Sequence, residues 1–527
     1  MNKHIFSIVC LATALFTFSN CSESDYTDKY TDPSKTTDVS CEKLMTGVFY
    51  AAKTYTTPEY WRVFTFDYYL LGRCAQTVGF INSPGRYAGG GESYINDRWT
   101  NFYHTLTQFR LLEYTYDNLS EANKPDYEVF VLLAKVMVYE QLEEVIDLWG
   151  DVPYSKAGYL AITGDVKSSY PSYDKAETLY EMMLGDLQVI NSKLAGLTPS
   201  SLATTYLSAQ DYINKGDLLK WRKFTNSLRL RMAMRVADKG SLTDKGRAIL
   251  REMLGDPSTY PLVDNNNETI KINSDTDAFK VTGDTNTGIQ GIESWNGQMN
   301  RASQAMINAL NGDPRLEIIY EPNSAGEYVG LDTHDDENTQ QTLFDRLEPD
   351  GGNYYSAIDT GTFSRNAQYP GILMTASEVS FIRAEACQKG YAQGDVREAF
   401  EKGVCQSVEL YYSLNSTSTY REPVPAPAVS DIAAFAAQKW ESYKSAEVAI
   451  ATQKWLHFGL IQILEAWNEV RRTGLPELYF PVDNNSPAYP KVFEKLRYPS
   501  DERNNNQANY ATVQAQDSYY IKLFWAK

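Results

Sequence analysis

The strongest constraint on the fold is a helical pattern of apolar residues that begins near Asp126. From here to the end of the segment, large apolar side chains recur at spacings of three and four, namely Val129, Leu132, Leu133, Val136, Met137, Leu142, Val145, Ile146 and Trp149. This spacing places them on one face of an α-helix. Pro125 lies just before the segment, where a helix tolerates it, and the Gly150–Pro153 turn ends it. The pattern therefore predicts a long helix over 126–148 with a buried face.

Similar periodicity predicts further helices on both sides of this one. They cover residues 40–56, 94–118, 173–193, 216–238, 242–254, 301–310, 375–389, 393–411, 428–438 and 441–472. In the last of these, Arg471 and Arg472 lie near the carboxyl end, where cations interact favourably with the helix dipole, and Gly474 can end the helix. The chain is therefore predicted to be mainly α.

Two segments show little of this helical pattern. Residues 57–91 are predicted to be a loop rich in aromatic residues and glycine, and residues 255–370 are rich in Gly, Asn, Asp, Thr and Tyr. Irregular segments of this length in a folded domain usually carry binding sites. We therefore predict a single domain over 39–527, in which helices at about 40–254 and 375–527 form the scaffold and the two irregular segments bind a ligand.

Residues 1–20 have the pattern of a secretory signal peptide. Lys3 precedes an apolar run from Ile5 to Phe18 that is too short to cross a bilayer with a margin. Cys21 follows at the cleavage boundary, where its thiol can accept a diacylglyceryl group. We therefore predict that Cys21 is the lipidated first residue of the mature chain and that its acyl chains hold the protein on a membrane. The alternative is a plain signal peptide with a chance cysteine.

Residues 21–38 are polar and predict a flexible tether between this anchor and the folded domain. No other stretch of 18 apolar residues occurs, so nothing else in the chain is expected to cross a membrane. The formal net charge is −18. An acidic surface argues against nucleic-acid binding and against broad contact with anionic lipid headgroups.

The cysteines and histidines do not predict a metal site. No Cys-x-x-Cys pair occurs, and His104, His334 and His457 lie far apart in the sequence. The acidic run Asp332–Glu337 lacks the residue order of a calcium-binding loop and is predicted to be a solvated surface. We expect no metal and no cofactor. Four cysteines could form disulfides or remain buried thiols, and they are Cys41, Cys74, Cys387 and Cys405.

A series of short tracts extends over nearly the whole chain. They are Asp147–Tyr154, Gly216–Asp217 with Trp221–Arg231, Asp313–Leu316, Ile382–Ala386, Gln453–Trp455, Glu465–Gly474, Arg497–Pro499 and Lys522–Trp525. Their order and spacing resemble the SusD/RagB family of outer-membrane nutrient-binding lipoproteins. The asparagine-rich tract Glu502–Asn509 and the length are most similar to its SusD-like second subfamily. Because paired charges and aromatic rings on helices are usually scaffold, the helix-borne tracts are predicted to identify the fold rather than the ligand site.

The resemblance implies a fold, a partner and a role. The fold is a curved scaffold of four tetratricopeptide-like helix pairs with irregular segments packed on it. The partner is a SusC-like TonB-dependent outer-membrane barrel, over whose extracellular mouth the lipoprotein sits as a lid. The role is the capture of a nutrient, an oligosaccharide or in some members a peptide, and its delivery to the barrel. Glu23 and Asp25 resemble the signal that sends such lipoproteins to the cell surface.

The two irregular segments contain the candidate ligand-binding residues, and the same two regions usually carry ligand contacts in the resembled family. Sugars and peptides are bound by flat aromatic faces with amide, guanidinium or carboxylate groups at the rim. The side chains that fit this description are Trp61, Arg73, Tyr87, Trp295, Asn296, Tyr354 and Tyr355. The alternative for each is packing within its loop.

No catalytic motif accompanies these residues. The sequence has no Gly-x-Ser-x-Gly, His-Glu-x-x-His, P-loop or Gly-x-Gly-x-x-Gly context. Glycoside hydrolysis needs two carboxylates across a cleft, and 67 acidic residues supply too many candidates to single out a pair. We therefore predict a binding protein rather than an enzyme, with a surface glycoside hydrolase or a purely structural surface protein as alternatives.

Overall fold

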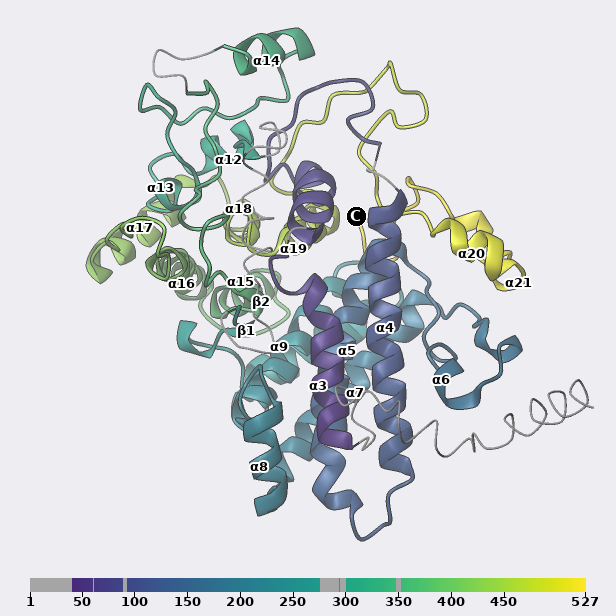
Figure 1. The fold of residues 1–527 in the computed structure, drawn as a ribbon. Helices are drawn as coiled ribbons and strands as arrows, with labels where there is room; N and C mark the ends of the chain where they lie inside the picture. The colour runs from purple at the N-terminus through teal and green to yellow at the C-terminus, as the bar shows by residue number, and fades with distance from the viewer. Residues whose placement is uncertain (1–39, 60, 89–91, 275–292, 294–299, 347–351) are drawn as a thin grey trace, which may run out of the picture. The chain divides into compact units, whose positions relative to one another are not determined.

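Helices dominate the computed structural model, which describes residues 40–59, 61–88, 92–274, 293, 300–346 and 352–527 (Figure 1). The longer helices of the first half are α3 (Cys41–Ala52), the π-helix η2 (Trp61–Gly72), α4 (Glu92–Asp117), α5 (Lys124–Trp149), α7 (Ala176–Gly196), α8 (Ser201–Gln210), α9 (Leu218–Val236) and α10 (Thr243–Gly255). Those of the second half are α15 (Ala376–Gln388), α16 (Val396–Ser416), α17 (Val429–Ser442), α18 (Ala446–Phe458) and α19 (Ile463–Thr473). The prediction of a mainly α fold is confirmed.

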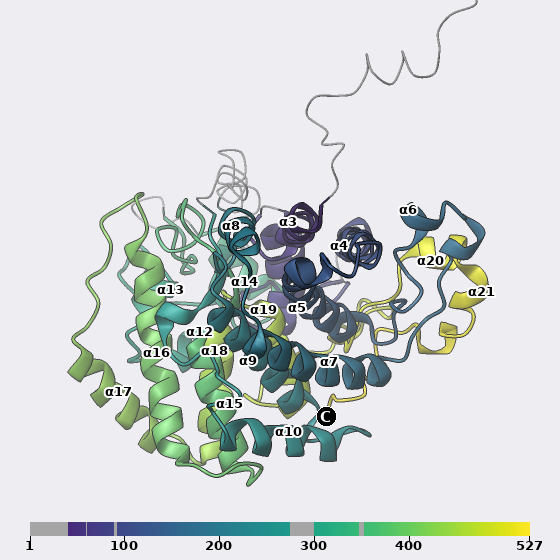
Figure 2. The same cartoon turned by 90° about the horizontal axis from the view of Figure 1, so that it is seen from below.

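Shorter elements connect these helices. They are α6 (Leu160–Thr163), α12 (Gln304–Ala309), α13 (Leu316–Ile319), α14 (Glu337–Phe344), α20 (Ser500–Asn505), α21 (Gln507–Tyr510) and the 3-10 turns η1 (Lys53–Tyr55), η3 (Lys167–Ser169), η4 (Asn266–Glu268) and η6 (Gln514–Gln516). Consecutive long helices pack against one another, as the predicted tetratricopeptide-like pairs require: α4 against α5, α9 against α10, α15 against α16 and α18 against α19. Figure 1 shows α3, α4 and α5 side by side, and Figure 2 shows the same for α15, α16 and α18.

The helix predicted from the strongest pattern is α5, and it forms the centre of the core. Pro125 occupies its first turn, and Gly150, with φ of 87°, ends it by donating its N–H to the carbonyl of Ile146 at 2.8 Å. From Val129 to Trp149 nearly every side chain of α5 is buried, including four polar ones. A helix buried around its whole circumference lies inside the core rather than on its surface.

The long helix predicted over 441–472 is wrong, because the structure divides it into α18 and α19. Gly459 follows α18 with φ of 25°, and its N–H closes the last turn of the helix on the carbonyl of Trp455 at 2.9 Å. The Tyr411 hydroxyl donates to the carbonyl of His457 at 3.0 Å, and a Cβ on Gly459 would lie 3.0 Å from that hydroxyl. A tyrosine from α16 therefore occupies the place where the helix would have continued.

The loop predicted over 57–91 is partly wrong, because it contains the helix η2. Val63, Phe66 and Leu70 are buried there, so apolar residues in this segment fill the core instead of forming a surface loop. Helix α8 was missed altogether. Only Ala203 and Leu207 are buried in it, and so narrow a stripe leaves no helical pattern in the sequence.

Described parts of the middle region are irregular but well connected by hydrogen bonds. Strand β1 (Ile270–Ile272) pairs antiparallel with β2 (Gly371–Met374), with Ile270 opposite Met374 and an irregularity after it. The N–H of Ala302 donates to the carbonyl of Ser356 at 2.9 Å, and the N–H of Leu331 donates to the carbonyl of Ala302 at 2.8 Å. Ala302, just before α12, is therefore bonded to the segment with Ser356 and to the segment with Leu331.

Charged residues of the short sequence tracts are buried in the helical part and pair with one another. Asp147 on α5 accepts from Arg235 at 2.6 Å, from the Tyr180 hydroxyl at 2.6 Å and from the Trp525 indole at 2.9 Å. Arg235 also pairs with Glu465 on α19. The role predicted for the tracts, scaffold rather than ligand site, agrees with this network, which links α5, α9 and α19.

A second buried network joins α15, α18 and α19. Arg472 pairs with Glu469 at 2.6 Å and with Glu385 at 2.7 Å, and Lys454 pairs with the same two carboxylates at 2.8 and 3.0 Å. Burial by itself raises the pKa of a carboxyl group, but the two cations hold the pKa of Glu469 below its usual range. We refer to α5, α9, α15, α18 and α19, with these two networks, as the scaffold.

Contacts divide the chain into two units, Met1–Ser40 and Cys41–Lys527. The predicted signal peptide, the lipidation site Cys21 and the tether over 21–38 lie outside the described residues. None of the helices described here combines the length and the apolar character needed to span a membrane. The four cysteines after Cys21 are free thiols, and they are Cys41, Cys74, Cys387 and Cys405.

Candidate functional site

A cleft of about 550 Å³ lies where four segments far apart in the sequence meet. The segments are the turn after η2, the stretch from α12 to His334, Trp455 on α18, and residues 476–479 after α19. Its volume lies within the range of ligand pockets, roughly 300–1,000 Å³. The cleft is lined by Gln76, Gln304, Ala305, Asn308, Ala309, Leu331, Asp332, Thr333, His334, Trp455, Pro476, Glu477, Leu478 and Tyr479.

Two stacked rings form an exposed aromatic surface in the cleft. The imidazole of His334 and the ring of Tyr479 are nearly parallel, with centroids 4.4 Å apart and an interplanar angle of 14°. The side chain of His334 is 68% exposed and Tyr479 is 49% exposed. Asp332 fixes the imidazole through its Nδ1 at 2.9 Å and also accepts the backbone N–H of His334 at 2.9 Å. The cleft therefore has a flat, oriented surface for the apolar face of a ligand.

Hydrogen bonds from two other lining residues hold Tyr479 in place. The Gln76 side chain donates to the carbonyl of Tyr479 at 2.5 Å, and the Thr333 hydroxyl donates to the same carbonyl at 3.1 Å. Gln76 is buried and adopts a left-handed backbone conformation with φ of 49°, which is uncommon for a residue other than glycine. Such strained positions persist where the surrounding structure imposes them, and they are frequent at binding sites.

Amide and carboxylate groups surround the two rings. Gln304 donates to the Asn308 side chain at 2.8 Å and accepts the N–H of Gly330 at 2.8 Å, so both ends of its amide are oriented. Asn308 and Glu477 are exposed at the cleft. A few oriented polar groups beside an aromatic surface are the usual composition of a site that binds sugars.

The loop over 81–88 forms hydrogen bonds with the segment that carries His334. Asn82 donates to the carbonyls of Thr333 at 3.0 Å and Asp335 at 2.7 Å. Gln340 donates to the carbonyl of Asp332 at 2.7 Å and accepts the N–H of Asn82 at 2.6 Å. The segment that carries His334 is therefore fixed from both sides before any ligand arrives.

Of the predicted site residues, Tyr87 and Arg73 lie near this cleft but do not line it. Tyr87 is 4% exposed, donates its hydroxyl to the carbonyl of Pro481 at 2.8 Å, and has its pKa raised by burial. Arg73 is half-buried with its guanidinium 4.0 Å from the centre of the Tyr69 ring, and burial lowers its pKa. Both residues pack against neighbouring segments, and their contact with a ligand stays a prediction.

The tyrosines predicted in the middle region do not line the cleft. Tyr354 and Tyr355 pack edge to face with centroids 5.2 Å apart. Tyr355 is 2% exposed and belongs to an apolar cluster with Ile81 and Leu331, of which Leu331 also lines the cleft. Burial raises the pKa of Tyr355. Their role in binding also stays a prediction.

Three predicted site residues cannot be placed relative to the cleft. Trp295 and Asn296 lie outside the described residues. Trp61 begins η2, but its side chain is likewise outside the description.

Sequence reasoning missed the two residues that form the exposed aromatic surface. His334 was assigned to a solvated acidic run, and Tyr479 was given no role. Thr333 and Tyr479 are 146 positions apart in the chain. No local pattern could have paired them.

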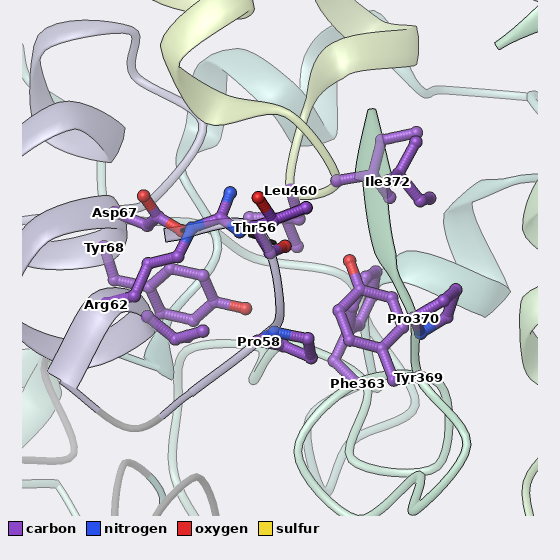
Figure 3. Close-up of a pocket in the computed structure, with 12 residues that line it drawn as sticks. Thr56, Pro58, Arg62, Asp67, Tyr68, Phe363, Tyr369, Pro370, Ile372 and Leu460 are labelled. Carbon is purple, nitrogen blue, oxygen red and sulfur yellow. Dashed lines mark hydrogen bonds and ion pairs between the residues drawn. The ribbon is translucent and has the colours of Figure 1, made fainter. Parts of the chain in front are cut away.

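Two other cavities are less suited to a sugar. The first, of about 30 Å³, has room for little more than a water molecule. Figure 3 shows Arg62 and Asp67 on one side of it and Phe363 and Tyr369 on the other. Arg62 pairs with Asp67 at 3.0 Å, but burial outweighs this and raises the pKa of Asp67 to about 6.

The second cavity, of about 460 Å³, lies between the α9–α10 region and α15–α16. No aromatic side chain is among the described residues that line it, and both lining lysines already have partners: Lys402 pairs with Asp264 at 2.7 Å, and Lys223 pairs with Glu268. No group of three or more metal-ligating side chains occurs in the part of the chain that the structure describes.

A further cavity, of about 340 Å³, is lined by the aromatic residues Trp467, Phe480 and Phe493, but Trp467 and Phe493 are buried in the core. We take the cleft with His334 and Tyr479 as the candidate binding site because it combines exposed stacked rings with oriented amides.

Solved structures with a similar fold cover nearly the whole chain. A chitin-binding protein is 21% identical, with 92% of this chain and 99% of that protein covered and a TM-score of 0.72. A SusD homolog from Bacteroides fragilis is 17% identical, with 93% and 100% covered and a TM-score of 0.69. A chitin-binding SusD homolog from Flavobacterium johnsoniae is 20% identical, with 91% and 98% covered and a TM-score of 0.66. At these identities the similarity shows a shared fold.

No curated protein sequence matches the chain significantly. A family model does match, over residues 33–499, and its description is "Starch-binding associating with outer membrane". Because this match covers most of the chain and the fold agrees with it, the protein belongs to the SusD-like_2 family.

Proposed function

We propose that this protein captures an oligosaccharide at the cell surface and delivers it to a SusC-like TonB-dependent barrel in the outer membrane. The observation that carries the proposal is the exposed stack of His334 and Tyr479 inside a cleft of about 550 Å³. Flat rings pack against the apolar faces of sugar rings, while the amides of Gln304 and Asn308 can pair with hydroxyl groups.

The family description and the two chitin-binding proteins of similar fold support a glycan as the ligand. The membrane part of the proposal is supported by the signal-like residues 1–20, by Cys21 and by the family's association with the outer membrane. Lipidation at Cys21 would hold the cleft near the barrel that it serves.

Binding is tested by titrating the purified protein with maltohexaose and with the hexamer of N-acetylglucosamine in a calorimeter. For whichever of the two hexamers the native protein binds, we expect Tyr479→Ala to lower the binding free energy by about 1–3 kcal/mol, because the variant removes one of the two stacked rings. Tyr114→Ala is the matched control, since Tyr114 is 51% exposed on α4 and does not line the cleft. Unchanged binding in Tyr479→Ala, with loss in Trp295→Ala, would move the site to the residues first predicted from the sequence.

Delivery and catalysis need separate measurements. The barrel should copurify with the full-length protein from detergent-solubilised outer membranes, and Cys21→Ser should abolish membrane retention. The bound hexamer should remain intact after long incubation, because we propose binding without turnover. Release of shorter sugars by the purified protein would contradict this and favour a glycoside hydrolase.

A further inference from the structure

Among the residues that the structure describes, the two lining side chains with a formal charge, Asp332 and Glu477, are both acidic. No described lysine or arginine lines the cleft. Asp335, Asp336 and Glu337 follow directly after the lining segment. Burial, together with the neighbouring carboxylates of Asp332 and Asp336, raises the pKa of Asp335, which is the effect expected in a locally negative region.

The two lining carboxylates are accessible to a ligand. Asp332 uses Oδ1 to hold His334, and its side chain is 40% exposed. Glu477 is exposed, and it forms no ion pair with any residue that the structure describes. Oxygen atoms of both residues can therefore accept hydrogen bonds from a bound molecule.

Cations of the neighbouring wall do not offset this charge. Arg86 lies 3.7 Å from Asp483 and donates to the carbonyl of Pro481 at 3.2 Å. Arg301 points its guanidinium over the ring of Phe344, 5.9 Å from its centre, and burial lowers its pKa. Neither side chain lines the cleft.

We infer that the cleft selects its saccharide by charge: it prefers sugars with free amino groups, accepts uncharged sugars, and rejects uronic acids and sulfated sugars. This inference rests on the proposed function. A protonated amine stacked near His334 and Tyr479 would pair with Asp332 and Glu477. A carboxylate or sulfate in the same place would face two like charges without a cation to compensate them.

The test compares three β-1,4-linked hexamers of equal length: glucosamine, N-acetylglucosamine and glucuronic acid. Calorimetry is done below the pKa of the sugar amine, so that the glucosamine hexamer is cationic. We expect the glucosamine hexamer to bind about 10-fold more tightly than the N-acetylglucosamine hexamer, with a preference that narrows as salt is added. We expect no detectable binding of the glucuronic acid hexamer.

Removing the two charges should remove the selection. In Asp332→Asn/Glu477→Gln we expect the glucosamine and N-acetylglucosamine hexamers to bind with nearly equal affinity, and the glucuronic acid hexamer to bind measurably. Asp244→Asn/Asp501→Asn is the matched control, because it removes the same charge from two exposed positions that do not line the cleft. This control should keep the full preference. Glu477→Gln alone, at an exposed position, should lower the preference partway without affecting folding.

Several outcomes would overturn the inference while leaving the proposed function intact. In the first, the glucuronic acid hexamer binds as tightly as the glucosamine hexamer. In the second, the cleft variant and the control show the same preference for the glucosamine hexamer. In the third, maltohexaose binds at the cleft and none of the three hexamers does. If a lysine hexapeptide binds as tightly as the glucosamine hexamer, the cleft selects charge and not a saccharide, which also overturns it. Failure of the proposed function is recognised separately, because no neutral sugar would then bind in a way that depends on Tyr479.

Discussion

In the scaffold, the polar side chains that matter most are buried and bonded to one another. In the cleft, the side chains proposed to contact the ligand are exposed, and Tyr479 is held through its backbone carbonyl. Asp147 and Arg235 have almost no exposed surface, and each has several protein partners. His334 and Tyr479 expose about half or more of their surface, and the bonds that fix Tyr479 reach its carbonyl rather than its ring. Substitutions should therefore affect folding in one region and binding in the other.

The largest expected effect is from Asp147→Ala in the scaffold. The variant leaves Arg235 buried with Glu465 as its remaining ion-pair partner and takes the acceptor away from Tyr180 and Trp525. Breaking a buried ion pair in this way costs about 3–5 kcal/mol of unfolding free energy. Urea denaturation measures this loss. Asp332→Ala at the cleft is the control and should change the unfolding free energy by no more than about 0.5 kcal/mol; a similar loss in both variants would erase the distinction.

The two histidines give a pH-dependent version of the same comparison. His457 is buried between the hydroxyls of Thr375 and Ser407, and burial, with a smaller contribution from Arg315, lowers its pKa to about 3. Unfolded, the same group has a pKa near 6.5, so below that pH the unfolded state binds the proton more readily. Stability is therefore lost as the pH falls from about 6.5 toward 3, by about 2 kcal/mol between pH 7 and pH 5 from this group.

His457→Gln should remove this contribution to the acid sensitivity. The difference in unfolding free energy between the native protein and the variant is then smaller at pH 5 than at pH 7, which thermal or urea unfolding at both pH values measures. His334→Gln at the cleft is the control and should keep the acid sensitivity of the native protein. An equal difference at both pH values would mean that His457 is not the group responsible.

The sequence predicts the scaffold well because its signals are local. The period of α5 and the turn at Gly150 are contained within a short segment. Where the scaffold was predicted wrongly, a distant residue was responsible: Tyr411 meets the chain at Gly459 and divides α18 from α19. A pattern read along one segment contains no information about such a contact.

The cleft was predictable only as a pair of irregular segments. Residues from both segments, Gln76 in one and Asn308 in the other, line it together with Tyr479 from a third. Composition identifies tyrosines but cannot tell which ones turn inward, as Tyr355 does, and which remain exposed. That distinction depends on tertiary contacts, such as the hydrogen bond from Gln76 to the carbonyl of Tyr479.

Gly330, next to the lining residue Leu331, should affect both folding and binding. A Cβ on Gly330 would lie 2.5 Å from the carbonyl carbon of Ser303 and even closer to the nitrogen of Gln304. In Gly330→Ala the segment must therefore shift away from the start of α12, which also carries Asn308. We expect a loss of about 1–2 kcal/mol in unfolding free energy, because overpacking of this kind is only partly relieved, and weaker binding of the hexamer.

Gly185→Ala is the matched control for this variant. Gly185 lies within α7 with no atom close to the added Cβ, so alanine should raise the unfolding free energy by about 0.5–1 kcal/mol and leave binding unchanged. Full binding in Gly330→Ala would show that the position of α12 does not matter for the ligand.

Two asparagines, one in each region, separate folding from binding, and the smaller effect of the two is expected at the cleft. Asn468 in the scaffold is fully buried and donates to Asp147 and Glu465, both at 3.1 Å. Asn308 at the cleft is exposed, and its bond to Gln304 uses only the oxygen of its amide. Alanine at Asn468 should lower the unfolding free energy by about 1–3 kcal/mol, because it leaves buried charges with fewer partners.

Alanine at Asn308 should leave the unfolding free energy within about 0.5 kcal/mol of the native value and weaken hexamer binding by about 0.5–1.5 kcal/mol, the net contribution of one neutral hydrogen bond. Calorimetry and urea denaturation on the same two preparations measure both quantities. If Asn308→Ala binds the hexamer normally while Tyr479→Ala does not, the ligand contacts the rings without reaching α12. Binding would then depend on His334 and Tyr479 alone, and only these two cleft residues would differ from the scaffold in affecting binding rather than folding.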